Sequence, residues 1–387
     1  MPVPLLDISR QHAPILSELR AVLDEALAGS RFIKGPALER FEHDLAGYCD
    51  ARRAVGCASG TDAIILALQA LDLAPGEEVV TTPFTFFASA GAIVRAGGIP
   101  VFIDIQPDTF NISPAAFKRF LDQNCALTDR GAVDRRTGLA VRALVAVDLF
   151  GQVADMDSLE RTCSDWGISL VEDACQSIGA MWKERRAGTF GRIGCFSFFP
   201  SKNLGALGDA GAMVTDDCAL ADRLVSLREH GGQGYIHREV GTNSRMDAIQ
   251  AGFLTVKLRH LDGWHDGRRR NAEFYARAFA DVDEIATPVI DPRAWSVYNQ
   301  YTVRAADRDG LMAHLKSAGI GCAVYYPLPL HLQECFSSLG YSAGDFPASE
   351  KAAAEVLSLP VFGELTEEEL GEVVRSVKDF YAKGRGR

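Results

Sequence analysis

Apolar residues follow two alternating patterns along much of the chain. Short, nearly continuous apolar runs indicate strands buried on both faces, and they lie at 78–82, 98–105, 143–150, 168–173, 195–199 and 212–215. Apolar residues at helical spacing predict amphipathic helices, and these fall between the strands at 61–71, 86–96, 114–123, 156–166 and 219–229. This alternation predicts an α/β fold with a mostly parallel sheet covered by helices on both faces.

The two ends of the chain follow other patterns. Helical spacing near the start occurs at 13–27 and 37–48, and a long helical pattern after Met246 leads into a basic helix. A proline-containing stretch at 288–295 is the expected connector to a smaller domain. In that domain, strands are predicted at 299–304 and 322–326, and helices at 309–318, 350–357 and 366–382. We expect an N-terminal arm (1–14), a large domain (15–262) and a small C-terminal α+β domain (263–387).

Length and charge narrow the possible functions. A chain of 387 residues with 47% apolar residues suffices for two domains. The net charge of -11, without a basic tract, argues against a nucleic-acid-binding protein. The chain shows no signal-peptide pattern and no apolar run of about 20 residues, so a cytoplasmic protein without membrane contact is expected. The nine cysteines lack metal-ligand spacing, which favours reduced thiols and no metal site.

Two polar residues follow strands of the predicted sheet. Asp173 ends one apolar run, and Lys202 follows another in a Pro-Ser turn. Ligands of such sheets bind beyond the carboxyl ends of the strands. A lysine that forms a Schiff base and a carboxylate on a pyridinium nitrogen are the two protein groups that pyridoxal phosphate requires. Taken singly, Lys202 could be a surface lysine and Asp173 a helix cap.

Smaller signals fit the same cofactor. A turn of small residues around Gly60 and Thr61 leads into a predicted helix, whose free N–H groups suit a phosphate. A plain helix cap by Ser59 is the alternative. Phe86 could stack on an aromatic ring or belong to the core. Ser197 could bind phosphate or only satisfy a backbone group.

Taken together, longer stretches resemble the DegT/DnrJ/EryC1/StrS family of sugar aminotransferases. The matching stretches are Phe-Ile-Lys-Gly-Pro at 32–36, Gly-Thr-Asp-Ala at 60–63, Thr-Pro-Phe-Thr-Phe at 82–86, Val-Glu-Asp-Ala-Cys-Gln at 171–176, Ser-Phe-Phe-Pro-Ser-Lys-Asn-Leu-Gly at 197–205, Gly-Thr-Asn-Ser-Arg-Met-Asp at 241–247, Tyr-Asn-Gln-Tyr-Thr at 298–302 and Tyr-Tyr-Pro-Leu-Pro-Leu-His at 325–331. The resemblance covers nearly the whole chain, in order. It implies an aspartate-aminotransferase-like fold and a homodimer with pyridoxal phosphate at the subunit interface.

The resemblance also implies roles for single residues. Lys202 would form the Schiff base with the cofactor, and Asp173 would face the pyridine nitrogen. Gln176 would bond the ring's 3-hydroxyl group, and Phe86 would stack on the ring. The contacts to the phosphate would come from Gly60, Thr61 and Ser197, with Asn243 reaching across from the second subunit.

For the reaction, the resemblance implies glutamate as donor and a keto sugar on a nucleotide diphosphate as acceptor. The stretches at 298–302 and 325–331 favour amination of C3 over C4. Related sugar dehydratases carry histidine in place of Lys202, so this lysine favours nitrogen transfer over the alternative of a dehydratase. A regulatory relative without activity is a further alternative. Candidate substrate contacts, each of which could instead be a dimer contact or a solvated side chain, are Arg228, His230, Tyr235, His237, Arg245, Tyr326 and His331.

The chain departs from the family pattern at two places. Asp148 opens an Asp-Leu-Phe-Gly-Gln stretch where members often read His-Leu-Tyr-Gly-Gln. The polar segment 128–138 is longer than usual, and we expect it to be a surface excursion.

Overall fold

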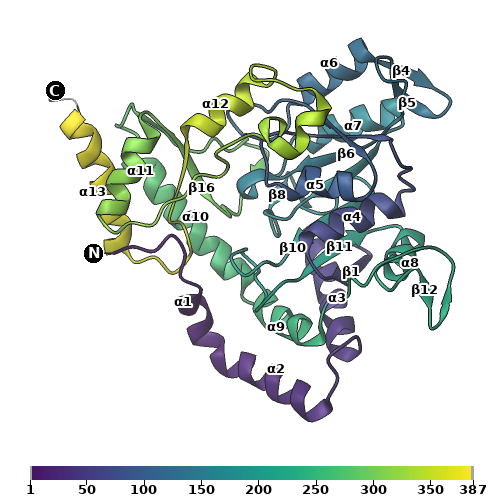
Figure 1. The fold of residues 1–387 in the computed structure, drawn as a ribbon. Coiled ribbons are helices and arrows are strands. Elements are labelled where there is room, and N and C mark those ends of the chain that lie inside the picture. Colours follow the sequence, from purple (N-terminus) through teal and green to yellow (C-terminus); the bar gives the residue numbers. More distant parts are fainter. Residues whose placement is uncertain (1, 385–387) are drawn as a thin grey trace.

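A seven-stranded sheet lies at the centre of the computed structural model, which describes residues 2–384 (Figure 1). Its strands are β1 (Arg53–Cys57), β2 (Glu78–Thr81), β3 (Ile99–Phe102), β6 (Val141–Val147), β7 (Ser169–Asp173), β10 (Ile193–Ser197) and β11 (Gly211–Thr215). They stand in the order β1-β11-β10-β7-β6-β2-β3. Within this sheet, β11 runs antiparallel to the other six strands. The predicted mostly parallel sheet is confirmed, with β1 as a strand that was not predicted.

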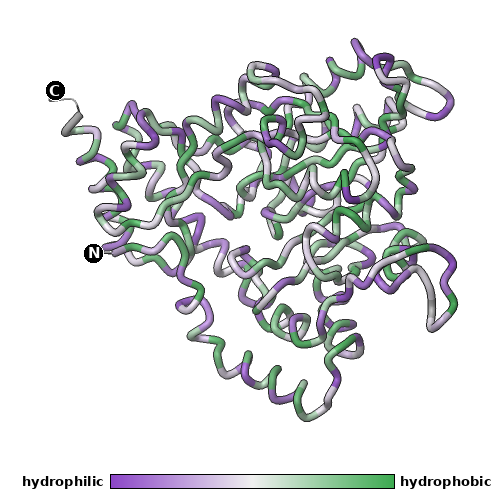
Figure 2. The backbone as a smooth tube through the Cα atoms, viewed as in Figure 1, coloured by the Kyte–Doolittle hydropathy of each residue, from purple (hydrophilic) through white to green (hydrophobic). Residues whose placement is uncertain are grey.

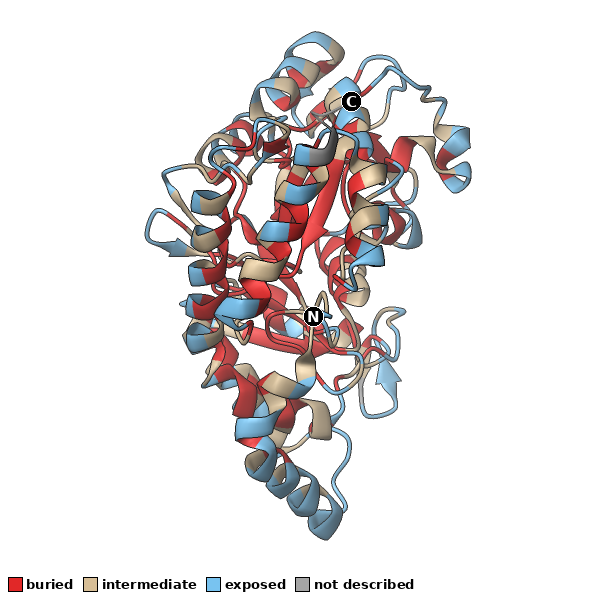
Figure 3. Ribbon diagram, turned by 90° about the vertical axis from the view of Figure 1, so that its left-hand side faces the viewer, coloured by how far each residue is buried: buried red, intermediate tan, exposed pale blue. Residues whose placement is uncertain are grey.

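Helices cover both faces of this sheet. One layer contains α4 (Gly60–Ala70), α5 (Ala88–Arg95) and α8 (Cys218–Leu227), and the other contains α3 (Pro36–Cys49), α6 (Pro114–Asn124), α7 (Met156–Trp166) and α9 (Ala248–Leu258). Successive strand residues face opposite layers, so Leu170 packs with the second layer and Val171 with the first. The strands are accordingly buried and the outer helix faces exposed (Figure 3).

The C-terminal part has a smaller core of its own. It consists of the sheet β14 (Ile285–Ala286), β16 (Tyr301–Ala305) and β17 (Val356–Leu359) with α10 (Leu261–Ala278), α11 (Arg308–Ser317) and α13 (Glu367–Gly384). Val3 is fully buried in this core and pairs with Ile320. The first residues of the chain therefore pack against its C-terminal part, at the left-hand side of the molecule in Figure 1.

Two predictions for the C-terminal part are wrong in detail. Residues 322–326 form no strand, since only Ala323 forms a β-bridge, to Ser358. The helix predicted at 350–357 is α12 (Pro347–Glu355), which ends early because the following residues pair with β16. The domain limits stay a prediction, and α10 runs across the expected boundary.

Two surface segments follow the expected polar patterns. The excursion around 128–138 is a hairpin of β4 (Cys125–Thr128) and β5 (Gly131–Asp134), in which the buried Asp134 pairs with Arg136 at 2.7 Å. In α2 (Leu16–Gly29), hydrophilic and hydrophobic residues alternate (Figure 2), as in an amphipathic helix. Within residues 2–384, no helix has the length and apolar character that crossing a bilayer requires.

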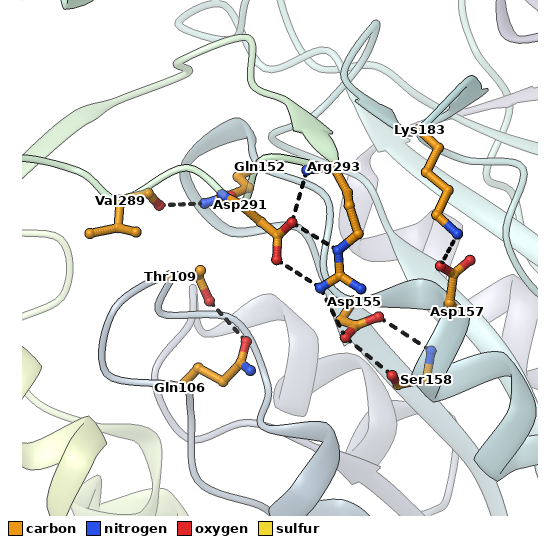
Figure 4. Close-up of polar contacts among 10 residues, drawn as sticks. All are labelled: Gln106, Thr109, Gln152, Asp155, Asp157, Ser158, Lys183, Val289, Asp291 and Arg293. Carbon is orange, nitrogen blue, oxygen red and sulfur yellow. Dashed lines mark hydrogen bonds and ion pairs between the residues drawn. The ribbon is translucent and has the colours of Figure 1, made fainter.

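The connector to the C-terminal part is fastened to the large domain by side chains (Figure 4). Gln152 uses both ends of its amide, because Nε2 donates to the carbonyl of Val289 at 3.1 Å and Oε1 accepts the N–H of Asp291 at 2.7 Å. Arg293 pairs with Asp291 at 2.8 Å and with Asp155 at 3.4 Å. These contacts hold the connector beside the loop that follows β6.

Candidate active site

A cavity of about 470 Å³ lies beyond the carboxyl ends of β7 and β10. This is the position at which parallel sheets bind ligands. Its volume lies within the range of small-molecule sites. Among the residues along its wall are eight that the sequence singled out, namely Gly60, Thr61, Phe86, Asp173, Gln176, Ser197, Lys202 and Tyr326.

Asp173 ends β7 and is nearly fully buried. Its Oδ1 accepts the N–H of Cys175 at 3.3 Å, and its Oδ2 accepts the hydroxyl of Ser89 at 2.7 Å. Ser89 in turn lies 3.1 Å from the hydroxyl of Thr85. The two donors thus reach both carboxylate oxygens and fix the orientation of the Asp173 side chain.

Lys202 lies in a tight turn after β10. Its N–H donates to the carbonyl of Phe199 at 2.8 Å, and the side chain of Asn203 donates to the carbonyl of Val297 at 3.0 Å. Gly205 is needed here because a Cβ would lie 2.3 Å from the carbonyl oxygen of Pro200.

The amine of Lys202 lies at the cavity wall without a hydrogen bond to another described side chain or backbone group. Burial lowers the pKa of Lys202, while Cys175 and Asp173 oppose that shift. A lowered pKa raises the share of neutral amine, the form that is nucleophilic and can accept a proton.

The start of α4 forms another part of the cavity wall. The Ser59 hydroxyl accepts the N–H of Asp62 at 3.1 Å, so the simple helix cap is present. The N–H groups of Gly60 and Thr61 belong to the first turn, where helices lack internal partners. A Cβ on Gly60 would lie 2.6 Å from the Cβ of Ser197. The cap and the anion site are therefore compatible, and the backbone approaches Ser197 closely.

Gln176 has its amide fixed from two sides. Oε1 accepts the N–H of Phe150 at 2.7 Å, and Nε2 donates to the hydroxyl of Tyr326 at 2.9 Å. Burial raises the pKa of Tyr326, which keeps the phenol neutral. The ring of Tyr326 lies 6.1 Å from that of Phe86, so the two aromatic side chains flank one side of the cavity.

Two candidate substrate contacts lie elsewhere, within the protein's own packing. Arg228 is buried and pairs with Glu42 at 2.5 Å. The ring of His331 is buried, with Nε2 3.2 Å from Glu350 and the ring centroid 4.8 Å from that of Phe346. Buried charged and polar groups need such partners, and this placement gives no support to a substrate contact for Arg228 or His331.

The remaining candidates also lie outside the cavity. His230, Tyr235 and His237 lie in or beside the hairpin of β12 (Gly232–Gln233) and β13 (Ile236–His237), and Tyr235 is fully exposed. Asn243 is exposed and Arg245 half-buried. Within one chain, Tyr326 alone among the predicted substrate contacts lines the cavity. The roles of the others, including that of Asn243, stay predictions.

Asp148, which stands where family members often have histidine, is fully buried. Its oxygens accept the N–H of Ala154 at 2.9 Å and the hydroxyl of Ser177 at 2.8 Å. Burial raises the pKa of Asp148 to about 7 and, with the Asp148 charge beside it, raises that of Glu172 well above its ordinary value. Through Ser177, Asp148 supports the turn next to Gln176.

The model of the DegT/DnrJ/EryC1/StrS aminotransferase family matches residues 15–378. This chain belongs to that family. Its relatives include a pleiotropic regulatory protein of Geobacillus stearothermophilus, 45% identical with 98% of this chain and 99% of the relative covered. Another is the UDP-N-acetyl-3-dehydro-alpha-D-glucosamine 3-aminotransferase of Acidithiobacillus ferrooxidans, 37% identical with 97% of each chain covered.

Solved structures support the same family assignment. The S. venezuelae DesV structure with a ketimine intermediate has a TM-score of 0.91 at 37% identity and covers 98% of both chains. The Bacillus subtilis NtdA structure, with bound cofactor PMP, has a TM-score of 0.87 at 29% identity and covers 98% of this chain and 85% of that chain. The chain is thus a pyridoxal-phosphate-dependent aminotransferase of this family.

The residues along the cavity fit pyridoxal phosphate. One wall offers the free amine of Lys202, and the buried carboxylate of Asp173 also faces the cavity. The start of α4, kept free of side-chain atoms by Gly60, offers backbone N–H groups for a phosphate. The amine and the carboxylate are the two protein groups that this cofactor requires, and the helix start suits its phosphate.

Proposed function

We propose that this enzyme transfers the amino group of glutamate to C3 of a keto sugar carried on a nucleotide diphosphate. The observation that carries the proposal is the presence of the Lys202 amine and the hydrogen-bonded Asp173 carboxylate on one cavity of about 470 Å³. A scaffold without catalytic function has no physical need for this combination at the end of a parallel sheet.

Each residue has a chemical task in this proposal. Pyridoxal phosphate, when bound, supplies an electron sink and carries nitrogen between the two substrates. Lys202 binds the cofactor covalently and, when free, moves a proton at the carbon that gains or loses nitrogen, which its lowered pKa favours. Asp173 would hold the ring nitrogen, Gln176 would bind the ring hydroxyl, and Phe86 would stack on the ring.

The phosphate site and the acceptor complete the proposal. Gly60, Thr61 and Ser197 hold the cofactor phosphate. Several relatives carry names that support a nucleotide sugar as acceptor and C3 as the aminated carbon, among them the A. ferrooxidans 3-aminotransferase and a dTDP-3-amino-3,4,6-trideoxy-alpha-D-glucose transaminase of Streptomyces venezuelae. Tyr326 lines the cavity and is the best-supported contact of this chain to the sugar.

A homodimer is part of the proposal. Large apolar side chains near the cavity are exposed in the single chain, including Phe86 at 56%, Phe199 at 52% and Leu207 at 43%. Such exposure is typical of surfaces that a partner covers. We propose that a second copy covers them and that its Asn243 reaches the phosphate of this chain's site. The exposed side chains of Tyr235 and His237 are available for contacts between the copies.

Two other functions deserve comparison. A regulatory function is supported by the name of the G. stearothermophilus relative, a pleiotropic regulatory protein. The intact set of Lys202, Asp173 and Gln176 favours catalysis. A dehydratase would use the same cofactor, but its family members carry histidine where this chain has Lys202.

The proposal is tested with the purified enzyme in its pyridoxamine phosphate form. We expect nucleotide 3-keto sugars to return the visible absorption of the pyridoxal form faster than 4-keto sugars do. Lys202→Ala should abolish turnover, and Lys118→Ala, which alters an exposed lysine on α6, should leave it unchanged. An enzyme that responds to neither class of sugar contradicts the proposed substrate.

A further inference from the structure

A short chain of hydroxyl groups leads to Asp173. The Thr85 hydroxyl lies 3.1 Å from that of Ser89, which lies 2.7 Å from Oδ2 of Asp173. All three residues are nearly inaccessible to water, with exposed fractions of 2%, 1% and 5%. Since an ionised carboxylate only accepts, the single hydroxyl hydrogen of Ser89 points to Asp173. Thr85 must therefore donate to Ser89, and both hydroxyls are polarised towards the carboxylate.

The position of Ser89 follows from the start of α5. Its N–H donates to the carbonyl of Phe86 at 3.2 Å, in the turn that leads into α5. Phe86 stands just before the N-cap residue Phe87 of α5, and both Phe86 and Ser89 line the cavity. One turn thus places an aromatic ring and a hydroxyl group at the same site, and the small residues Ala90 and Gly91 follow it inside the protein.

The Ser89 hydroxyl makes the shorter of the two hydrogen bonds to Asp173. The titratable groups that interact with it are Asp148, Cys175, Cys195, Lys202 and Tyr326. Of these, only Lys202 can carry a positive charge. The other donor to the carboxylate is the N–H of Cys175 at a longer 3.3 Å.

We propose that Ser89, backed by Thr85, is a positioning residue that holds Asp173 ionised and aimed at the ring nitrogen of the cofactor. The inference rests on the proposed placement of that nitrogen beside Asp173. A hydrogen bond to the charged form of an acid lowers its affinity for a proton. Without the Ser89 hydroxyl, Asp173 should draw the proton away from the ring nitrogen.

The test uses the full chain loaded with pyridoxal phosphate that carries ¹⁵N in its ring. The ¹⁵N chemical shift reports how far the ring nitrogen is protonated, independently of turnover. Ser89→Ala should move the proton-sharing equilibrium towards Asp173 roughly tenfold or more, the effect of losing a hydrogen bond to a charged group. Thr85→Val should cause a smaller shift in the same direction, and Ser89→Thr should restore the wild-type signal.

Controls separate positioning from packing. Ser358→Ala removes another buried hydroxyl, one that lies 2.8 Å from Thr302 in the small sheet, and should leave the ring signal unchanged. A wild-type signal in both Ser89→Ala and Thr85→Val overturns the inference while leaving Asp173 beside the ring. An unprotonated ring nitrogen in the wild type overturns the placement itself. If Ser89→Ala fails to fold, Thr85→Val decides by the same criterion.

Discussion

Close contacts at single residues give the cofactor site its shape. At Gly60, a side chain would meet the Cβ of Ser197 at 2.6 Å and the Sγ of Cys175 at 2.9 Å. These neighbours belong to the strand ends that also carry Asp173 and lead to Lys202. The start of α4 can therefore move aside only if the cavity itself changes.

The substitution Gly60→Ala tests this close approach. The added methyl group should displace α4 from Ser197, destabilise the protein by about 1–3 kcal/mol, and weaken cofactor binding at least about tenfold. Gly47→Ala, near the end of α3, is the matched control, because a Cβ there meets nothing within 4 Å. Cofactor titration followed by absorbance measures the difference, and equal affinities for both variants would contradict the account of Gly60.

Residues expected to contact the cofactor directly were easier to predict from the sequence than residues that position another side chain. Lys202, Asp173 and Gln176 follow strands, and the motifs around them brought all three to one cavity. Ser89 was missed because its role depends on Asp173, which lies 84 positions away in the sequence. One hydroxyl in a helix start carries no signal of such a distant contact. The burial of Arg228 and His331 also could not be predicted from the sequence, because only the fold brings them to their partners Glu42 and Glu350.

At the scale of elements, α10 buries a histidine between two parts of the protein. His265 is inaccessible to solvent, and neither ring nitrogen has a hydrogen-bond partner among the described residues. Burial, together with Arg268, Arg186 and Arg269, lowers the pKa of His265 to about 3. The folded protein therefore keeps this ring neutral, whereas the unfolded chain protonates it near its ordinary pKa of 6.5.

This difference makes stability depend on pH. Below pH 6.5 the unfolded state binds a proton that the folded state does not bind until about pH 3, so stability falls as the pH falls through this window. From pH 7 to pH 5, His265 should lower the free energy of unfolding by about 2 kcal/mol. Urea denaturation should show this loss reduced in His265→Phe but retained in His43→Gln, which alters an exposed histidine. An identical loss in both variants would rule out His265 as its source.

The sequence predicted helices and strands well where the apolar pattern extends over many residues. It predicted them poorly where a short segment becomes a strand only by pairing with another strand. The helices and parallel strands of the large domain matched their predicted positions within a few residues. β1 was missed because Arg53–Cys57 is short and contains glycine, and it exists through its pairing with β11. At 322–326 the apolar residues resemble a strand, but only Ala323 finds a pairing partner there.

At the scale of the whole molecule, the proposed dimer predicts that two inactive variants restore each other. Lys202→Ala removes the amine, and Asn243→Ala removes the group that a second copy would supply. In a hybrid dimer, the chain with intact Lys202 receives an intact Asn243 from its partner. An equal mixture should regain about a quarter of wild-type activity, because half of the dimers are hybrids with one complete site of two.

Mixed dimers must form by unfolding and refolding the two variants together, with each variant refolded alone as the control. If Asn243 serves the site of its own chain, no hybrid contains a complete site. An inactive mixture with normal dimer content would therefore contradict the shared site.

The central claim is nitrogen transfer to a nucleotide-linked keto sugar. It is tested most directly by incubating the enzyme with ¹⁵N-labelled glutamate and a nucleotide 3-keto sugar, followed by mass spectrometry of the sugar product. The account predicts a labelled amino group on the sugar, absent with Lys202→Ala. A sugar that loses water without gaining labelled nitrogen, or that stays unchanged, would contradict it.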